Sequence, residues 1–212
     1  PRFYVVDRPG APQTVIRIHM PGTPADDPAR LRVHLVNSVL GGTFTSRLMQ
    51  NLREDKGWTY GIGSRHAHFQ QDGSLIISTA LQAEFTGAAL DEIMTEVEAL
   101  AESGVSADET TKAVRSYQND QVETYGSISS VGQVLVTLID EDLPPGTSAS
   151  WLEQAATIDA AALSSQAGAM FLPQHAVVVL VGDAASIQAQ LEERGYPEAV
   201  ECDAEGNLLP AR

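Results

Sequence analysis

The sequence lacks the features that mark several large classes of protein. Its 212 residues include a single cysteine, Cys202, so the chain can form no internal disulfide and no thiolate cluster for a metal. The longest apolar run, from Ala176 to Val181, is far shorter than the ~20 residues of a membrane-spanning helix. No basic segment is followed by an apolar one, so we expect no signal peptide. Because Cys202 lies near a polar C-terminus, we expect it to be an ordinary surface thiol.

Basic residues are also scarce. The chain has 13 Lys and Arg against 28 Asp and Glu, which gives a formal net charge of −15. Nucleic acids and anionic membrane surfaces bind basic patches, so this balance argues against both kinds of partner. The acidity would attract basic peptides, although solubility is the simpler explanation. The chain opens with Pro1 in strand-like sequence, so we expect a processed chain or a fragment of a longer protein. The compartment therefore stays open between periplasm and cytoplasm.

The common catalytic signatures are absent as well. A catalytic zinc generally needs three protein ligands, and the 5 histidines form neither H-E-x-x-H nor the inverted H-x-x-E-H. His66 and His68 share a face of an expected strand. They could bind a metal together, but we favour the interpretation that both are solvent-facing polar residues. The sequence also has no G-x-S-x-G elbow, Walker loop or Rossmann glycine pattern. We therefore expect no catalytic zinc site in this chain.

The spacing of apolar and turn residues predicts an α+β fold over residues 1–212, taken as one structural unit. Segments 58–69 and 74–81, joined by the turn 70–73, read as a hairpin, which favours an antiparallel or mixed sheet with helices packed on one face. The other expected strands are 14–20, 175–181 and 199–202. The expected helices are 31–40, 44–56, 85–103, 106–125, 133–139, 159–171 and 183–194. Capping residues are expected at Thr45 or Ser46, at Ser106 with Glu109, at Asp159 and at Asp183.

The segment L-G-G-T-F-T-S-R-L-M-Q-N-L-R-E-D-K-G-W-T-Y, from Leu40 to Tyr60, combines two glycines, a helix, basic residues and an aromatic pair. Arg53 lies near the end of the expected helix, and Tyr60 begins the next strand across Gly57. Both side chains can donate hydrogen bonds to a peptide carbonyl or to the oxyanion that forms when water attacks it. From chemistry alone, a simpler interpretation is an arginine paired with Glu54 or Asp55 and a tyrosine at the rim of the core.

This segment resembles the zinc-less second-half domain of the pitrilysin/insulinase-type zinc peptidases, a group that includes the mitochondrial processing peptidase. The family pattern, L-G-G-x-F-x-S-R-L-x-x-x-L-R-E-x-x-G-x-x-Y, is matched throughout. Residues 7–13 resemble the entry to the first strand of that domain, and 195–208 resemble its tail. The resemblance therefore extends over nearly the whole chain and implies the α+β metallohydrolase fold of the mitochondrial processing peptidase.

The resemblance also implies a function. Two such domains, in one chain or two, close around an unfolded peptide, and one of them carries H-x-x-E-H and the zinc. The other supplies an arginine and a tyrosine, which here are Arg53 and Tyr60, to hold the substrate main chain and stabilise the tetrahedral intermediate. Gly41 and Gly42 match the glycine-rich turn that touches substrate in some members, whereas we interpret Ser46 and Arg47 as structural.

The expected protein is thus the zinc-free half of a zinc-dependent endopeptidase, not catalytic alone, that works with an H-x-x-E-H-bearing partner domain in a homo- or heterodimer. The alternatives are a catalytically silent scaffold subunit and a stand-alone peptide-binding module of the same fold. The intact Arg53 and Tyr60 favour the peptidase half, because a scaffold has no need of them. Neither the natural substrate nor its cleavage preference follows from the sequence.

Overall fold

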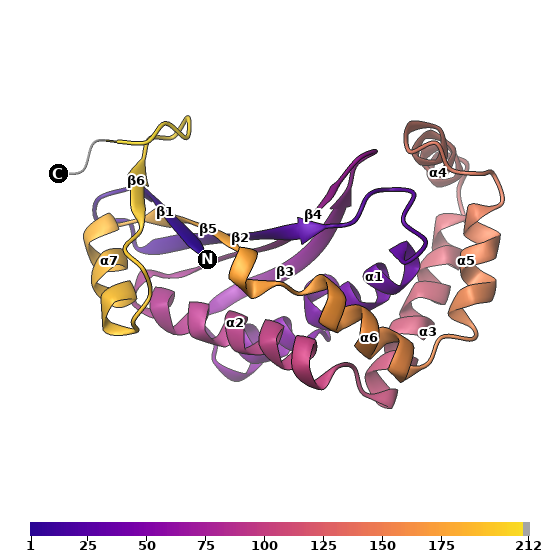
Figure 1. The fold of residues 1–212 in the computed structure, drawn as a ribbon, viewed down its shortest axis with the longest axis horizontal. Helices are drawn as coiled ribbons and strands as arrows, with labels where there is room; N and C mark the ends of the chain where they lie inside the picture. Colours follow the sequence, from indigo (N-terminus) through magenta and orange to yellow (C-terminus); the bar gives the residue numbers. More distant parts are fainter. Residues whose placement is uncertain (210–212) are drawn as a thin grey trace.

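The computed structural model describes residues 1–209, which form one mixed sheet and a set of helices (Figure 1). The strands are β1 (Arg2–Asp7), β2 (Gln13–Gly22), β3 (Thr59–His68), β4 (Gly73–Gln82), β5 (Val177–Gly182) and β6 (Val200–Cys202). The α-helices are α1 (Arg30–Asn37), α2 (Thr86–Ser103), α3 (Ala107–Thr124), α4 (Ile128–Asp140), α5 (Thr147–Ala155), α6 (Ala160–Met170) and α7 (Ala184–Glu193). Two π-helical segments, η1 (Ser38–Gly42) and η2 (Met49–Asp55), and two 3₁₀ turns, η3 (Ala83–Phe85) and η4 (Pro173–His175), complete the chain.

The strands lie in the order β3-β4-β2-β5-β1-β6. The predicted hairpin is present as β3 and β4, and β2 is antiparallel to both β4 and β5. At the other end, β1 runs parallel to β5 and β6. The predicted α+β fold with a mixed sheet is therefore confirmed. The prediction omitted β1 as a separate strand, and the segment 7–13 turns from β1 into β2.

All of the packed helices cover the same face of the sheet, as predicted (Figure 1). The strand residues on that face, such as Val5, Ile16, Ile18 and Leu180, are fully buried. They form one apolar core with the inner faces of α1, α2, α6 and α7. The opposite face, which we call the open face, carries the alternate residues of each strand, and on β2 these are exposed or half-buried. Such alternation is typical of a sheet with one covered side.

Several of the predicted helix ends are present. Ser106 and Glu109 form a capping box at the start of α3, with the serine hydroxyl accepting the Glu109 N–H. The Asp159 and Asp183 side chains cap α6 and α7 in the same way. Gly104 ends α2 with a φ of 73°, a conformation that favours glycine. These helix ends could be predicted from the sequence because each capping residue acts on backbone groups within a few residues of itself.

Several helical predictions need correction. The helix expected over 31–40 is α-helical only to Asn37 and continues as the π-helix η1, and most of 44–56 is the π-helix η2. Neither Thr45 nor Ser46 caps η2 with its side chain, and the buried Ser46 hydroxyl has no hydrogen-bond partner. In the second half, α5 was not predicted, and α4 begins at Ile128 rather than after Gly132.

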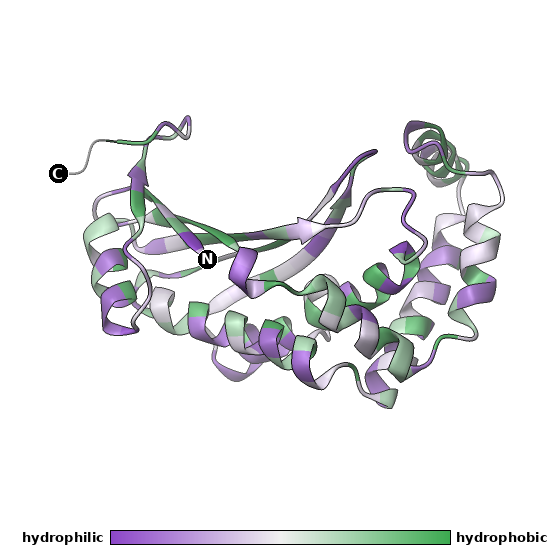
Figure 2. Cartoon of the chain, in the orientation of Figure 1, coloured by the Kyte–Doolittle hydropathy of each residue, from purple (hydrophilic) through white to green (hydrophobic). Residues whose placement is uncertain are grey.

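Helix α4 lies at one end of the molecule and is apolar but exposed (Figure 2). Its exposed side chains include Ile128, Leu135, Val136 and Ile139, and no residue of α4 is buried. Contiguous apolar surface of this kind is typical of protein interaction sites. Within residues 1–209, no helix combines the length and apolar character needed to cross a bilayer.

Cys202 is buried, which contradicts the expected surface thiol. Strand β6 pairs with β1, and Cys202 is also bridged to Leu208, so chain segments surround the thiol. Its S–H donates to the Val5 carbonyl at 3.6 Å, and burial raises the pKa of the Cys202 thiol. The prediction failed because it judged exposure from the polar neighbours in sequence rather than from strand pairing.

Candidate functional site

The Leu40–Tyr60 segment lies on η1, η2 and the start of β3. π-Helical turns are rare and are often found at functional sites, so two of them in one motif single out this segment. Gly41 is buried in η1, where a Cβ would lie 2.7 Å from the Ser64 N and Oγ atoms of β3. Gly42 is exposed, and a Cβ there would lie 3.0 Å from the Asn37 Nδ2 atom. The close approach of η1 to β3 therefore requires glycine at position 41.

Arg47 anchors this segment to the junction between α2 and α3. Its guanidinium makes two hydrogen bonds to the Glu109 carboxylate, at 2.7 and 3.0 Å, and a third to the Gly104 carbonyl at 3.0 Å. The arginine, together with the Ser106 donors of the capping box, lowers the pKa of Glu109 to about 2. The interpretation of Arg47 as a structural ion-pair residue is confirmed.

Arg53 lies in the last turn of η2, about one-third exposed. Its guanidinium carbon stacks 4.4 Å from the centroid of the exposed Phe44 ring. A contact of 3.4 Å to the Glu54 carboxylate is the ion pair that the simpler interpretation anticipated, and it is long for a hydrogen-bonded pair. The stacking on Phe44 holds the guanidinium in place while leaving N–H donors accessible.

Tyr60 is 94 % exposed, so it does not fill the rim of the core. Its neighbour Thr59 pairs with Leu81 on the covered face, and a bulge between Thr59 and Ile62 sets Tyr60 and Gly61 opposite Ala80. Alternation along the strand therefore places the Tyr60 side chain on the open face. Within residues 1–209, no hydrogen bond joins the Arg53 and Tyr60 side chains. Both are free to contact a molecule outside this chain.

The histidines form no metal site. The rings of His66 and His68 are 4.1 Å apart, but both contact the turn after β2. The His66 Nε2 atom accepts the Thr23 N–H, and the His68 Nδ1 atom lies 3.1 Å from the Thr23 carbonyl. Burial, with nearby His68 and Arg30, lowers the pKa of His66 to about 4. They are half-buried structural residues, not solvent-facing ones.

No group of three or more His, Cys, Asp or Glu side chains within the described residues is arranged to hold a metal ion. Zinc therefore does not fit the side chains of residues 1–209. No catalytic step through a metal can be assigned to the described residues.

A groove of about 720 Å³ lies between β3 and α1 on one side and α3, α4 and α5 on the other. Three buried polar atoms in its lining, Asn37 Oδ1, His66 Nδ1 and Tyr117 Oη, have no hydrogen-bond partner within the described residues. Burial raises the pKa of Tyr117 to about 12, so the phenol is protonated near neutrality. His34 is exposed within this groove and packs edge-on against Tyr117. The sequence did not reveal the groove, because its walls come from distant segments.

A comparison with protein-family models matches residues 1–117 to the peptidase M16 inactive domain. The chain belongs to the peptidase M16 family. The match confirms the zinc-less domain that the Leu40–Tyr60 motif indicated. Among curated proteins, the chain is 29 % identical over 110 residues to an uncharacterised zinc protease, SCO5738, of Streptomyces coelicolor, covering 52 % of this chain and 24 % of that protein. It is 46 % identical over 43 residues to a second, YmxG of Bacillus subtilis, covering 20 % and 10 % respectively.

Solved structures share the fold. The peptidase M16 inactive domain from Pseudomonas fluorescens superposes with a TM-score of 0.78 at 23 % identity, over 86 % of this chain and 44 % of that one. A protease from Helicobacter pylori superposes with a TM-score of 0.76 at 16 % identity, over 84 % and 43 %. This M16 domain thus spans less than half the length of these relatives.

Proposed function

We propose that this M16 domain is the substrate-handling half of a zinc-dependent endopeptidase, in which a partner domain bearing H-x-x-E-H supplies the zinc. The observation that carries the proposal is that the Arg53 and Tyr60 side chains remain accessible to a second molecule. Both retain the family motif, and both present hydrogen-bond donors that the described residues leave free. A tyrosine that is 94 % exposed on a strand contributes little to folding, so its position suits contact with another molecule.

The proposed chemistry uses hydrogen-bond donation alone. The Tyr60 O–H and the Arg53 N–H groups would hold the carbonyl oxygen of an extended peptide, and bind it more tightly as negative charge develops there during attack by water. The guanidinium of an arginine and the hydroxyl of a tyrosine both carry hydrogen-bond donors suited to a carbonyl oxygen. Gly41 and Gly42 would border the path of the peptide.

A partner domain also accounts for other features of the molecule. The curated relatives are zinc proteases of greater length, whereas the described part of this chain has no zinc site. Helix α4 leaves an apolar face uncovered, which supports association with a second domain in a homo- or heterodimer. A chain of this kind would bind unfolded peptide without hydrolysing it alone.

The test is substitution of the two donors in the assembled, zinc-loaded enzyme. Tyr60→Phe and Arg53→Ala should each lower kcat by about 10²–10³, the usual effect of removing one oxyanion donor, with zinc content unchanged. Matched controls are Tyr125→Phe and Arg115→Ala, which alter exposed residues on or beside α3 and should leave kcat unchanged. Unchanged kcat in both site variants would exclude the transition-state role and favour the scaffold alternative.

A further inference from the structure

The open face of the sheet carries a row of alternating basic and apolar side chains. The strand register joins, from β3 to β1, the residues Arg65, Ile76, His19, Val177 and Arg2. Each residue in the row alternates with a buried neighbour on its own strand, so the row faces away from the helices. Arg65 and Arg2 are exposed, and His19 is half-buried.

The next row on the same face also contains an exposed arginine among uncharged residues. Here Gly63, Ser78, Arg17, Val179 and Tyr4 are successive partners, and Arg17 is exposed. Burial and the positive charges of Arg17 and Arg65 lower the pKa of His19, which shows that these side chains share one electrostatic environment. The histidine is therefore neutral near neutrality, and the arginines carry the charge of the open face.

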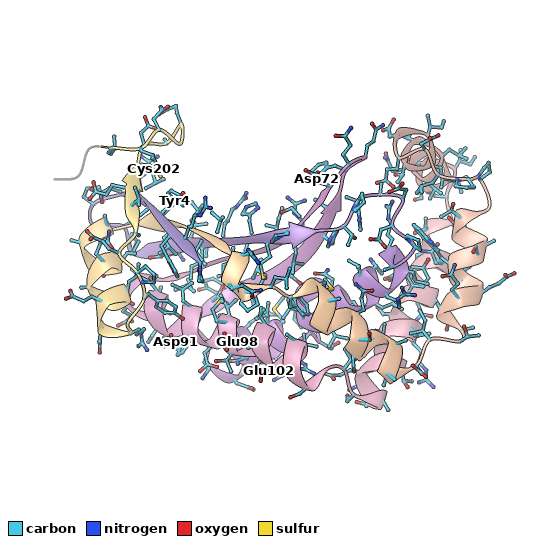
Figure 3. All side chains as sticks on the ribbon, viewed as in Figure 1. Tyr4, Asp72, Asp91, Glu98, Glu102 and Cys202 are labelled. Atoms are coloured by element: carbon cyan, nitrogen blue, oxygen red, sulfur yellow. The ribbon has the colours of Figure 1, made fainter. Side chains whose placement is uncertain are left out.

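These arginines are not neutralised by the chain itself. Within residues 1–209, Arg2, Arg17 and Arg65 form no ion pair, and the outward positions of the six strands include no Asp or Glu. The acidic residues lie elsewhere: Figure 3 shows Asp91, Glu98 and Glu102 along α2, on the far side of the sheet. In a chain with a net charge of −15, the open face is thus a local basic surface.

The size of this surface fits an extended polypeptide. Four strand spacings separate Arg65 from Arg2, which is roughly 19 Å, the length of about six residues of extended chain. Between the arginines, the half-buried Val177 can contact the side chains of a bound segment, whereas Ile76 is buried and only supports the surface. A long nucleic acid is a poorer fit, because the acidic remainder of the chain repels a polyanion.

Tyr60 lies on this same open face. We propose that the open face binds an acidic, extended segment of the peptide substrate and so favours cleavage next to Asp- or Glu-rich sequence. This inference rests on the proposed function, because it makes Tyr60 and the arginines parts of one peptide-binding surface. The arginines would position the segment, whereas Tyr60 would contact the reacting carbonyl.

The first experiment measures binding to the 212-residue chain. One unstructured, dye-labelled peptide is made in a Glu-containing and a matched Gln-containing version, and both are titrated by fluorescence anisotropy. The Glu peptide should bind more tightly, and the difference should shrink at high salt. Arg17→Gln with Arg65→Gln should weaken its binding about two- to thirtyfold, the effect expected for two exposed ion pairs. Arg32→Gln with Arg115→Gln, which removes the same charge from helices, should have little effect.

The second experiment repeats the comparison in the assembled enzyme, with KM and kcat for both peptides. The Glu peptide should have the lower KM, and the Arg17/Arg65 double variant should remove that difference while Arg17→Lys with Arg65→Lys retains most of it. Circular dichroism and thermal unfolding verify that each variant is folded. Sedimentation of the wild-type chain tests whether a second, acidic copy covers this face.

The outcomes separate the inference from the proposed function. Equal binding and equal KM for the two peptides, in an enzyme that cleaves both, would overturn the acidic preference and leave the proposed function intact. An assembly that cleaves neither peptide would count against the proposed function, and the binding titration would still decide the inference. Self-association that is abolished by Arg17→Gln with Arg65→Gln would assign the face to a second copy and overturn the inference.

Discussion

The contact between Arg47 and Glu109 predicts how firmly the Leu40–Tyr60 motif is held. Glu109→Gln keeps the side-chain volume and one carbonyl acceptor but removes the negative charge that two guanidinium N–H groups bind at 2.7 and 3.0 Å. The Arg47 and Glu109 side chains are only 22 % and 25 % exposed, so the remaining arginine would be poorly solvated. The substitution therefore tests whether this single contact stabilises the attachment of the segment just before η2 to α3.

The size of the effect follows from the partial burial. Fully exposed ion pairs contribute about 0–1 kcal/mol, and breaking a fully buried pair costs about 3–5 kcal/mol. A bidentate pair that is three-quarters buried lies between these limits, so we expect a loss of about 2 kcal/mol in the free energy of unfolding. For a chain of this length, that loss lowers the Tm by about 4–8 °C.

Urea denaturation at a series of pH values provides the assay. Because the folded-state pKa of Glu109 is depressed to about 2 from the ordinary value of 4.5, the stabilisation is fully present above that ordinary value. The difference between wild type and Glu109→Gln should therefore be constant near neutrality and shrink as pH falls below 4.5 towards 2. The exposed Glu102 provides the control, and Glu102→Gln should change stability by less than about 0.5 kcal/mol. A difference for Glu109→Gln below about 0.5 kcal/mol at neutral pH would refute the reasoning.

Three further predictions concern packing. Gly41→Ala should destabilise the fold by about 1–3 kcal/mol in urea denaturation, because its Cβ would overlap Ser64 of β3. Gly132→Ala on α4, where a Cβ meets nothing within 4 Å, should be neutral or stabilise by up to about 1 kcal/mol, and a large loss would contradict the placement of α4. Cys202 should react with a thiol reagent at least about tenfold more slowly in the native chain than in urea, and equal rates would show that the thiol is not buried.

The parts of the fold that could be predicted were those encoded by local signals. The apolar stripe from Ile93 to Leu100, the stop at Gly104 and the Ser106–Glu109 box fix the ends of α2 and α3 within a few residues. The hairpin of β3 and β4 was equally readable, because a polar turn separates two β-like runs. Patterns of this kind repeat at the period of the element that they encode.

The missed features depend on contacts between distant segments. The π-helical hydrogen bonding of η1 and η2 leaves little trace in apolar spacing, and the approach of Gly41 to Ser64 joins residues from two elements. Cys202 is buried only because β6 pairs with β1 at the other end of the chain. Helix α5 has only a short run of apolar spacing, which did not identify it as a helix. Its Trp151 ring contacts the Arg30 guanidinium, a contact between distant segments that the sequence does not show.

The candidate site was likewise predictable from the sequence only in part. The motif identified Arg53 and Tyr60, but only the structure showed Phe44 beneath the guanidinium and Tyr60 on the open face. The basic surface formed by Arg17 and Arg65 was not visible in the sequence, where the overall acidity suggested attraction for basic peptides instead. A net charge describes the whole molecule, whereas binding depends on the charge of one face.

The most direct test of the central claim is peptide cleavage by this chain alone and by this chain mixed with its zinc-bearing partner domain, with and without a chelator. We predict that only the mixture cleaves, and that the chelator abolishes the activity. Chelator-sensitive cleavage by the chain alone, or no cleavage by a properly assembled and zinc-loaded mixture, would contradict the claim that this M16 domain is the substrate-handling half of a peptidase.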